Sequence, residues 1–300
     1  MVAGAAILAL VLGLAWYFHD AADPARQLAL KAGRIDLVRS LQVAIASASD
    51  AEKSAVLAIT DEDSVAFADQ ARAATAEVER ERQELGLLLA EGGTREELDL
   101  FARFSEAFGS LQRIDDEVLS LSVRNTNIKA YALTFGPAAD TLAEFDASLA
   151  RVAARLDDSR EDRKASGLAS GARIGILRIQ GLLAPHIAEE SDAKMDRLEA
   201  AMAAEEAQVG KDLVGLATLT TLAGNADLAT AASRFARYRE LKVRILALSR
   251  ENTNVRSLEL SLNQKRKAMA LCLDALTALQ QVLVAEPVRG VTYGRPVHPR

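Results

Sequence analysis

The feature that most constrains the fold of this chain is a tandem repeat. Asn125-Thr126-Asn127 recurs 127 residues later as Asn252-Thr253-Asn254. The same shift, without a gap, relates further identical residues upstream of the motif: Glu62 and Glu189, Ser64 and Ser191, Asp69 and Asp196, Phe108 and Phe235, Leu119 and Leu246, Leu121 and Leu248, and Ser122 and Ser249. One offset that holds over so long a stretch indicates a duplication, with repeat 1 at about residues 37–163 and repeat 2 at about residues 164–290.

Apolar residues around each motif recur with helical spacing. In repeat 1 they step alternately by three and four: Leu100, Phe104, Ala107, Leu111, Ile114, Val118, Leu121, Ile128, Ala132 and Phe135. This pattern is typical of one face of a long helix. Asn125, and Asn252 in repeat 2, fall on this face where the pattern asks for a hydrocarbon. Because an unpaired buried amide costs about 1–3 kcal/mol, we expect each Asn to find a polar partner.

The composition favours helices and excludes several classes of protein. Half of the 300 residues are hydrophobic but only 4% are aromatic, which is typical of long helices packed side by side, so we predict an all-α fold. The formal net charge of −6 argues against nucleic acid as a partner, because nucleic acid needs a basic surface. The single cysteine, Cys272, excludes a disulfide framework and a cysteine-based zinc site, and is expected to be a small buried hydrophobe.

The N-terminus carries a membrane-span pattern. Val2 to Phe18 is an uninterrupted apolar run of 17 residues, slightly shorter than the roughly 20 that a span typically needs. Trp16 and Tyr17 stand where an interfacial aromatic belt would lie. We therefore interpret residues 1–19 as a transmembrane anchor. A cleavable signal peptide and a buried core helix are the alternatives, but the small residues that a cleavage site needs are poorly matched here.

The charges around this run bear on its orientation. No Lys or Arg precedes it, whereas Arg26, Lys31, Arg34 and Arg39 follow it. Taken literally, the positive-inside rule places the large domain in the cytoplasm. The bare Met1-Val2 before the run suggests instead that a basic leader is missing.

Breakers and caps divide the remaining chain into six predicted helices. They cover residues 24–90, residues 94–135, a third helix through 142–156, a fourth through 176–185, a fifth over 186–217 and a last over 227–285. The predicted ends are Gly92-Gly93, Gly136-Pro137, Pro185, Gly224-Asn225 and Pro287. Thr94 and Glu97 form a capping box. The Gly/Pro-rich tail, residues 287–300, is predicted to be disordered.

This helix order predicts the architecture. One long, four short and one long helix fold back naturally as two stacked antiparallel four-helix bundles, formed from a duplicated helical hairpin over residues 20–286. Counting residues from the turns places both motifs at a similar height, so we predict that they meet in one polar belt. Its members are Asp63, Ser64, Asn125, Thr126, Glu190, Ser191, Asn252 and Thr253, with Arg124 and Arg250 near its edge.

The belt has a structural and a functional interpretation. It can be a hydrogen-bonded layer that fixes helix register. It can also be a ligand pocket in which an arginine meets a carboxylate. The candidate ligand-binding residues are Arg124, Asn125, Asn127, Arg250, Asn252, Asn254, Ser64 and Ser191. We expect no catalytic residues, cofactor or metal, because His186 and Glu189 form only one His-x-x-Glu pair whereas a di-iron bundle needs two Glu-x-x-His motifs.

At this point the chain resembles the four-helix-bundle sensor modules of methyl-accepting chemotaxis receptors. The residues that carry the resemblance are the Leu-Ser-x-x-Asn-Thr-Asn segments at 121–127 and 248–254, within a six-helix layout after an N-terminal span. The layout is similar to the helical bimodular variety and to the sensor of TorS-type kinases. Such modules lie in the periplasm, outside the bacterial inner membrane, and bind small molecules, often organic acids or amino acids, or a periplasmic binding protein.

The resemblance implies a function but not a complete receptor. We expect a single-pass inner-membrane protein with a periplasmic sensor domain, which forms a homodimer. Pro287 to Arg300 contains no apolar run, whereas such receptors continue into a second span, a HAMP linker and a transmitter. A signal would therefore pass through a signalling membrane protein partner. The alternatives are a rigid helical scaffold without a small-molecule ligand, and a fragment of a longer receptor.

Overall fold

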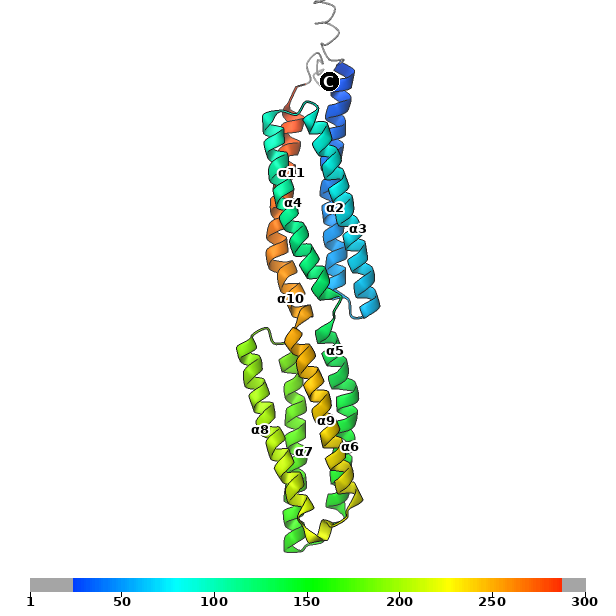
Figure 1. Cartoon of the computed structure of the whole chain (residues 1–300), viewed down its shortest axis with the longest axis vertical. Helices are drawn as coiled ribbons and strands as arrows, with labels where there is room; N and C mark the ends of the chain where they lie inside the picture. The colour runs from blue at the N-terminus through cyan, green and yellow to red at the C-terminus, as the bar shows by residue number, and fades with distance from the viewer. Residues whose placement is uncertain (1–23, 288–300) are drawn as a thin grey trace, which may run out of the picture. The chain divides into compact units, whose positions relative to one another are not determined.

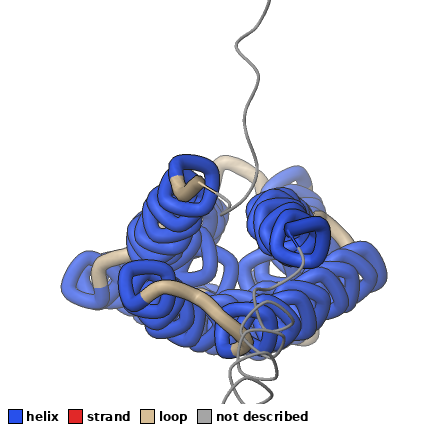
Figure 2. The backbone as a smooth tube through the Cα atoms, turned by 90° about the horizontal axis from the view of Figure 1, so that it is seen from above, coloured by secondary structure: helices blue, strands red, loops and turns tan. Residues whose placement is uncertain are grey.

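The computed structural model describes residues 24–287, and this part of the chain contains helices and no strand (Figures 1 and 2). The predicted all-α fold is therefore confirmed for these residues. The predicted anchor, residues 1–19, and all but the first residue of the predicted tail lie outside them. The α-helices are α2 (Pro24–Leu57), α3 (Asp61–Ala90), α4 (Arg95–Ser122), α5 (Thr126–Leu133), α6 (Ala139–Ala154), α7 (Arg160–Ile187), α8 (Asp192–Ala217), α9 (Ala226–Glu251), α10 (Thr253–Leu260) and α11 (Arg266–Ala285).

The helices form two compact units. Within the described chain, unit 1 comprises residues 24–53, 69–115 and 263–287, and unit 2 comprises residues 54–68 and 116–262. The core of unit 1 draws its apolar side chains from α2, α3, α4 and α11, and that of unit 2 draws them mainly from α6, α7, α8 and α9. Under the 127-residue shift these are equivalent sets, with α11 in the place of α6. Each unit thus takes three helices from one repeat and the fourth from the other. The stacking of two bundles stays a prediction.

The duplication is visible in the backbone itself. Asn125 (φ 50°, ψ 38°) and Asn252 (φ 52°, ψ 37°) are the non-glycine residues with positive φ in the described chain. Each precedes an eight-residue helix, α5 or α10, and each of these runs into a five-residue π-helix, Thr134–Ala138 or Ser261–Lys265. The two series of irregularities are related by the same shift as the sequence motifs.

The predicted long helices are interrupted, which corrects the sequence interpretation. The helix predicted over residues 24–90 breaks after Leu57 and begins again at Asp61. Thr60 Oγ1 accepts a hydrogen bond from Asp63 N at 3.1 Å, so this threonine caps the new helix. The helices predicted over 94–135 and 227–285 break at Asn125 and Asn252, because asparagine tolerates the left-handed conformation better than other non-glycine residues.

Two predicted breakers do not break. Pro137 lies inside the π-helix Thr134–Ala138, and the chain continues directly into α6. A wider π turn accommodates the missing proline N–H, and Gln180 Nε2 donates to Thr134 O at 2.9 Å. Pro185 lies inside α7, which ends at Ile187, so the next helix begins at Asp192 and not at His186 as predicted.

Several predicted local features are present. Glu97 N donates to Thr94 Oγ1 at 3.2 Å and Thr94 N donates to Glu97 Oε2 at 2.9 Å, which confirms the capping box. Cys272 is fully buried, and burial raises the pKa of its thiol to about 12. Arg34, which the orientation analysis counted as a flanking charge, is buried and donates to Leu88 O at 2.7 Å. It therefore satisfies the end of α3.

One described stretch, Ala226–Ala285, contains a window long and apolar enough to cross a membrane. This test uses length and composition only, and core helices of soluble proteins pass it. Within the stretch, Phe235, Tyr238 and Ile245 pack in the core of unit 2, and Leu276 and Leu279 pack in the core of unit 1. Its apolar character is therefore also what core packing requires.

Glu97 gives a pH-dependent prediction. Burial, with the nearby Glu286 charge, raises the pKa of the Glu97 carboxyl. The folded state therefore favours the protonated acid, and this stabilisation is present below the unfolded pKa and is lost as pH rises through the folded pKa. Glu97→Gln keeps the capping acceptor without the charge. We expect it to match the parent at about pH 4 and to unfold at higher urea concentration at pH 7.

The matched control is Glu96→Gln, which changes the exposed neighbouring carboxylate and is expected to alter the unfolding free energy by less than about 0.5 kcal/mol at either pH. If Glu97→Gln were equally destabilised at both pH values, the burial of an unfavourable charge at this position would be contradicted.

Candidate functional site

The two Asn-Thr-Asn motifs meet inside unit 2, as predicted. Thr126 N donates to Thr253 Oγ1 at 3.2 Å, and Thr253 N donates to Thr126 Oγ1 at 3.1 Å. The two hydroxyl oxygens are 3.2 Å apart. Both threonines are buried, so the contact lies in the interior of the unit.

The asparagines repeat the same exchange. Asn127 N donates to Asn254 Oδ1 at 3.1 Å, and Asn254 N donates to Asn127 Oδ1 at 3.2 Å. Asn127 Nδ2 donates to Asn252 Oδ1 at 2.7 Å, and Asn254 Nδ2 donates to Asn125 Oδ1 at 3.0 Å. We call residues 125–127 and 252–254 the Asn-Thr-Asn layer.

The left-handed residues explain why this exchange is needed. Asn125 and Asn252 end the preceding helical segment, so the first N–H groups of α5 and α10 lack acceptors within their own helices. Neither asparagine side chain caps its own helix. The acceptors come from the other motif instead. Each repeat therefore caps the helix that begins in the other repeat.

Carbonyl groups at nearby helix ends receive the remaining donors. Asn127 Nδ2 also donates to Ile187 O at 2.7 Å, and Asn252 Nδ2 donates to Glu189 O at 2.9 Å. Asn125 Nδ2 donates to Asp61 Oδ1 at 3.0 Å. The amides of the layer are thus occupied by protein groups from α3, from the end of α7 and from the segment after it.

The two predicted serines have different roles. Ser64 is buried, and its hydroxyl lies 3.2 Å from Ala55 O and 3.1 Å from Ser122 O. Ser191 precedes α8 as its N-cap residue but makes no side-chain capping bond. Asp63 and Glu190, which were predicted in the same belt, are exposed at helix starts and are not bonded to the layer by their side chains in any contact described above.

Both predicted arginines are neutralised by protein carboxylates. Arg124 forms an ion pair with Glu251, the residue at the equivalent position of the other repeat. Arg250 forms ion pairs with Asp192, Asp196 and, at 2.7 Å, Glu199. The hydrogen bond from Arg250 is the main reason why the pKa of Glu199 is lowered. Neither guanidinium therefore offers an uncompensated charge to a carboxylate ligand.

A Ser-His-Glu set beside the layer was not predicted. His186 is fully buried, with Nδ1 2.8 Å from Ser249 Oγ and Nε2 2.9 Å from Glu199 Oε1. These residue types could serve nucleophilic catalysis, which requires that a substrate reach the hydroxyl. Ser249 is fully buried, and its hydroxyl lies 3.1 Å from His186 O as a donor. The set therefore joins α7, α8 and α9 as a structural link.

The sequence had paired His186 with Glu189 on one helical face, and this pairing is wrong. α7 ends at Ile187, so Glu189 leaves the helical face. Its carboxylate accepts from Ser191 N at 3.0 Å and forms an ion pair with Lys194 at 3.3 Å. Within residues 24–287 no three His, Cys, Asp or Glu side chains are grouped so that they could hold a metal ion.

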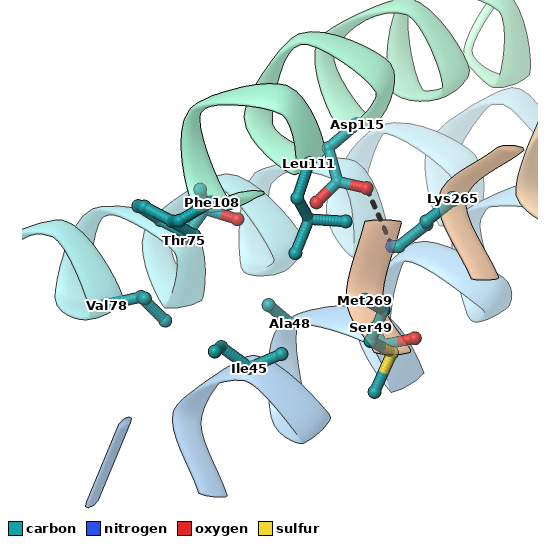
Figure 3. A pocket seen from close by; sticks show the side chains of 10 residues that line it. All are labelled: Ile45, Ala48, Ser49, Thr75, Val78, Phe108, Leu111, Asp115, Lys265 and Met269. Carbon is teal, nitrogen blue, oxygen red and sulfur yellow. Dashed lines mark ion pairs between the residues drawn. The ribbon is translucent and has the colours of Figure 1, made fainter. Parts of the chain in front are cut away.

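Unit 1 contains a second buried polar cluster, which the motif analysis missed. Lys265 Nζ lies 2.7 Å from Glu52 Oε2 and 2.8 Å from Asp115 Oδ1, with at most 8% of any of these side chains exposed. Figure 3 shows Asp115 and Lys265 beside a cavity of about 10 Å³, which Ser49 also lines. This is about the room that one water molecule needs.

The cluster has no counterpart in unit 2. The equivalent positions there carry Ala138, Ile179 and Lys242. A helix bearing Lys265 in the place of α6 would therefore face an isoleucine and a second lysine. The cluster favours the packing of α11 in unit 1, because only there does the buried ammonium meet two carboxylates.

The Asn-Thr-Asn layer yields a coupling prediction. Asn127→Ala and Asn254→Ala each leave a backbone N–H of the other motif without its acceptor, so each should cost about 1–3 kcal/mol of unfolding free energy. Because they belong to one network, the double variant should deviate from additivity by about 0.5–3 kcal/mol in urea unfolding. Asn263→Ala, at an exposed position, serves as the control. Strict additivity would contradict reciprocal capping.

Lys265 yields a prediction for unit 1. Lys265→Met leaves two carboxylates buried without their cation, so it should cost about 3–5 kcal/mol in urea unfolding. The triple variant Glu52→Leu, Asp115→Leu and Lys265→Met removes all three charges and should recover most of this loss. The exposed Lys267→Met is the control. A cost for Lys265→Met as small as that of the control would show that the cluster is not buried.

No model of a protein family, no curated protein and no solved structure matches this chain. The resemblance to chemoreceptor sensor modules therefore stays a prediction that rests on the helix layout and on the repeated motif.

Proposed function

We propose that this chain is a non-catalytic helical module of the sensor type, held at a membrane by residues 1–19, that acts by binding another protein. The observation that carries the proposal is that the Asn-Thr-Asn layer is closed. Its side-chain amides and hydroxyls bond to one another and to helix ends, and Arg124 and Arg250 already have carboxylate partners. Recognition is then left to the outer surfaces of the helices.

The buried polar groups support a structural rather than a chemical role. The Ser249–His186–Glu199 set and the Lys265–Glu52–Asp115 cluster are the places where several functional groups converge in the described interior. The hydroxyl and the imidazole of the first, and the ammonium of the second, are enclosed by their partners. A catalytic centre would need a site that a substrate can enter.

The membrane placement belongs to the same proposal. It rests on the apolar run Val2 to Phe18 and on the resemblance to periplasmic sensor modules of the bacterial inner membrane. The buried role of Arg34 removes one of the four charges that favoured a cytoplasmic domain. A homodimer and a signalling membrane protein as partner are further parts of this proposal.

Two measurements on the intact chain test the proposal. A thermal-shift screen with small carboxylates and amino acids should give no stabilisation, whereas a ligand at about 100 times its Kd would add about 2.7 kcal/mol. Photo-crosslinking in cells, from a photoreactive residue at Leu177, Val214 or Leu271, should capture one specific protein, because these positions are exposed on α7, α8 and α11.

The contrary outcome is equally specific. A carboxylate that stabilises the parent but not Arg124→Ala or Arg250→Ala would show that the layer is a ligand site and would overturn the proposal. Absence of a specific crosslink from any exposed helix face would also count against it.

A further inference from the structure

In unit 1, α4 and α11 border an open groove of about 530 Å³ (Figure 1). Its walls are mostly short or apolar, and the lining residues are Leu100, Arg103, Glu106, Ala107, Ser110, Ala268, Leu271, Asp274, Ala275 and Ala278. Leu271 is 62% exposed, although leucine gains free energy when it leaves water. The groove thus presents apolar surface that this chain leaves uncovered.

The other repeat provides an internal comparison. In unit 2 the helices equivalent to α4 and α11 are α9 and α6, and the positions equivalent to Ala107 and Leu271 carry Arg234 and Glu144. Arg234 and Glu144 form an ion pair at 2.5 Å across the two helices. Long charged side chains therefore cover in unit 2 the surface that is open in unit 1.

A second pair of positions shows the same exchange. Leu100 and Ala278 of unit 1 correspond to Asp227 and Arg151 of unit 2, which form an ion pair at 2.7 Å. Because the same helix pair folds with these ion pairs, bundle packing does not require apolar residues here. The groove of unit 1 is thus a property of its surface and not of its core.

Two shallower hollows continue the groove along the same helices. One is lined by Thr94, Glu96, Gln281, Val282, Ala285 and Glu286, and the other by Arg95, Glu96, Asp99, Leu100 and Arg103. The three share lining residues in series. From Ala268 to Glu286 the chain advances about 27 Å at about 1.5 Å per residue, the length of a helix of roughly 18 residues.

The charges of this continuous surface are unbalanced. The acidic lining residues are Glu96, Asp99, Glu106, Asp274 and Glu286, and the basic ones are Arg95 and Arg103, which gives a net formal charge of −3. Two copies of this surface would repel one another, so charge argues against a second copy of this chain as the occupant. It favours an occupant with basic edges.

We propose that the α4/α11 groove binds a basic amphipathic helix of a partner protein. The apolar face of that helix, with anchors at positions i, i+3, i+4 and i+7, would cover Leu100, Ala107 and Leu271, while its Lys or Arg side chains face the acidic rim. This inference rests on the proposed function, because it names the partner's chemistry and the surface that receives it.

The test uses the full chain and two synthetic helical peptides of 18 residues. Both carry the same Leu/Ala face, and their flanking residues are Lys in one and Glu in the other. Fluorescence anisotropy should show binding of the Lys peptide at least tenfold tighter than that of the Glu peptide. The affinity for the Lys peptide should fall as ionic strength rises.

The repeat supplies the matched variants. Ala107→Arg with Leu271→Glu copies the ion pair of unit 2 into unit 1, and should abolish binding of the Lys peptide without loss of thermal stability. Glu144→Leu with Arg234→Ala opens the equivalent surface of unit 2, and should leave binding to unit 1 unchanged. These variants separate closure of the groove from damage to the fold.

Three results would overturn the inference: equal affinity for both peptides, undiminished binding by the closed variant, or self-association of the chain that the closed variant abolishes. The proposed function would fail separately. A partner crosslinked from Leu177 or Val214 but not from Leu271 would retain the protein-binding function and reject this groove, whereas the absence of any partner would reject both.

Discussion

The structure of unit 2 depends on one exchange, in which each Asn-Thr-Asn motif caps the helix that begins in the other repeat. The left-handed Asn125 and Asn252 interrupt their helices and expose backbone N–H groups that burial would otherwise leave unpaired. Thr253 and Asn254 accept from one set, and Thr126 and Asn127 accept from the other. Neither helix start is complete without the other repeat, which explains why the motif is needed twice.

The two repeats share this layer but differ around it, and the differences carry the functional argument. Position 124/251 has become an Arg–Glu ion pair, as expected when a contact between equivalent residues is no longer constrained to be identical. The buried Lys265 cluster has only Ala138, Ile179 and Lys242 opposite it in the comparison, and favours one choice of fourth helix. The groove beside Leu271 is bridged by Arg234 and Glu144 in the other unit. Duplication thus supplied a common frame, and each unit has a surface of its own.

The sequence predicted the helical class, the repeat, the meeting of the two motifs and the buried Cys272, because each depends on periodicity or on identical residues. It did not predict the left-handed Asn125, since the apolar spacing continues through that residue. The π turn around Pro137 was missed because proline is also the usual end of a helix. The ion partners of Arg250 and the Lys265–Glu52 contact could not be found, because they join residues 51 and 213 positions apart that only packing brings together.

Native-state hydrogen exchange measured by NMR tests the reciprocal caps most directly. The amides of Thr126, Asn127, Thr253 and Asn254 lie at helix starts, where N–H groups without acceptors exchange quickly. We predict that all four exchange only by global unfolding, and that Asn254→Ala selectively accelerates exchange at Asn127 in the opposite repeat. Fast exchange of these four amides in the parent protein, or acceleration confined to the mutated repeat, would contradict the account.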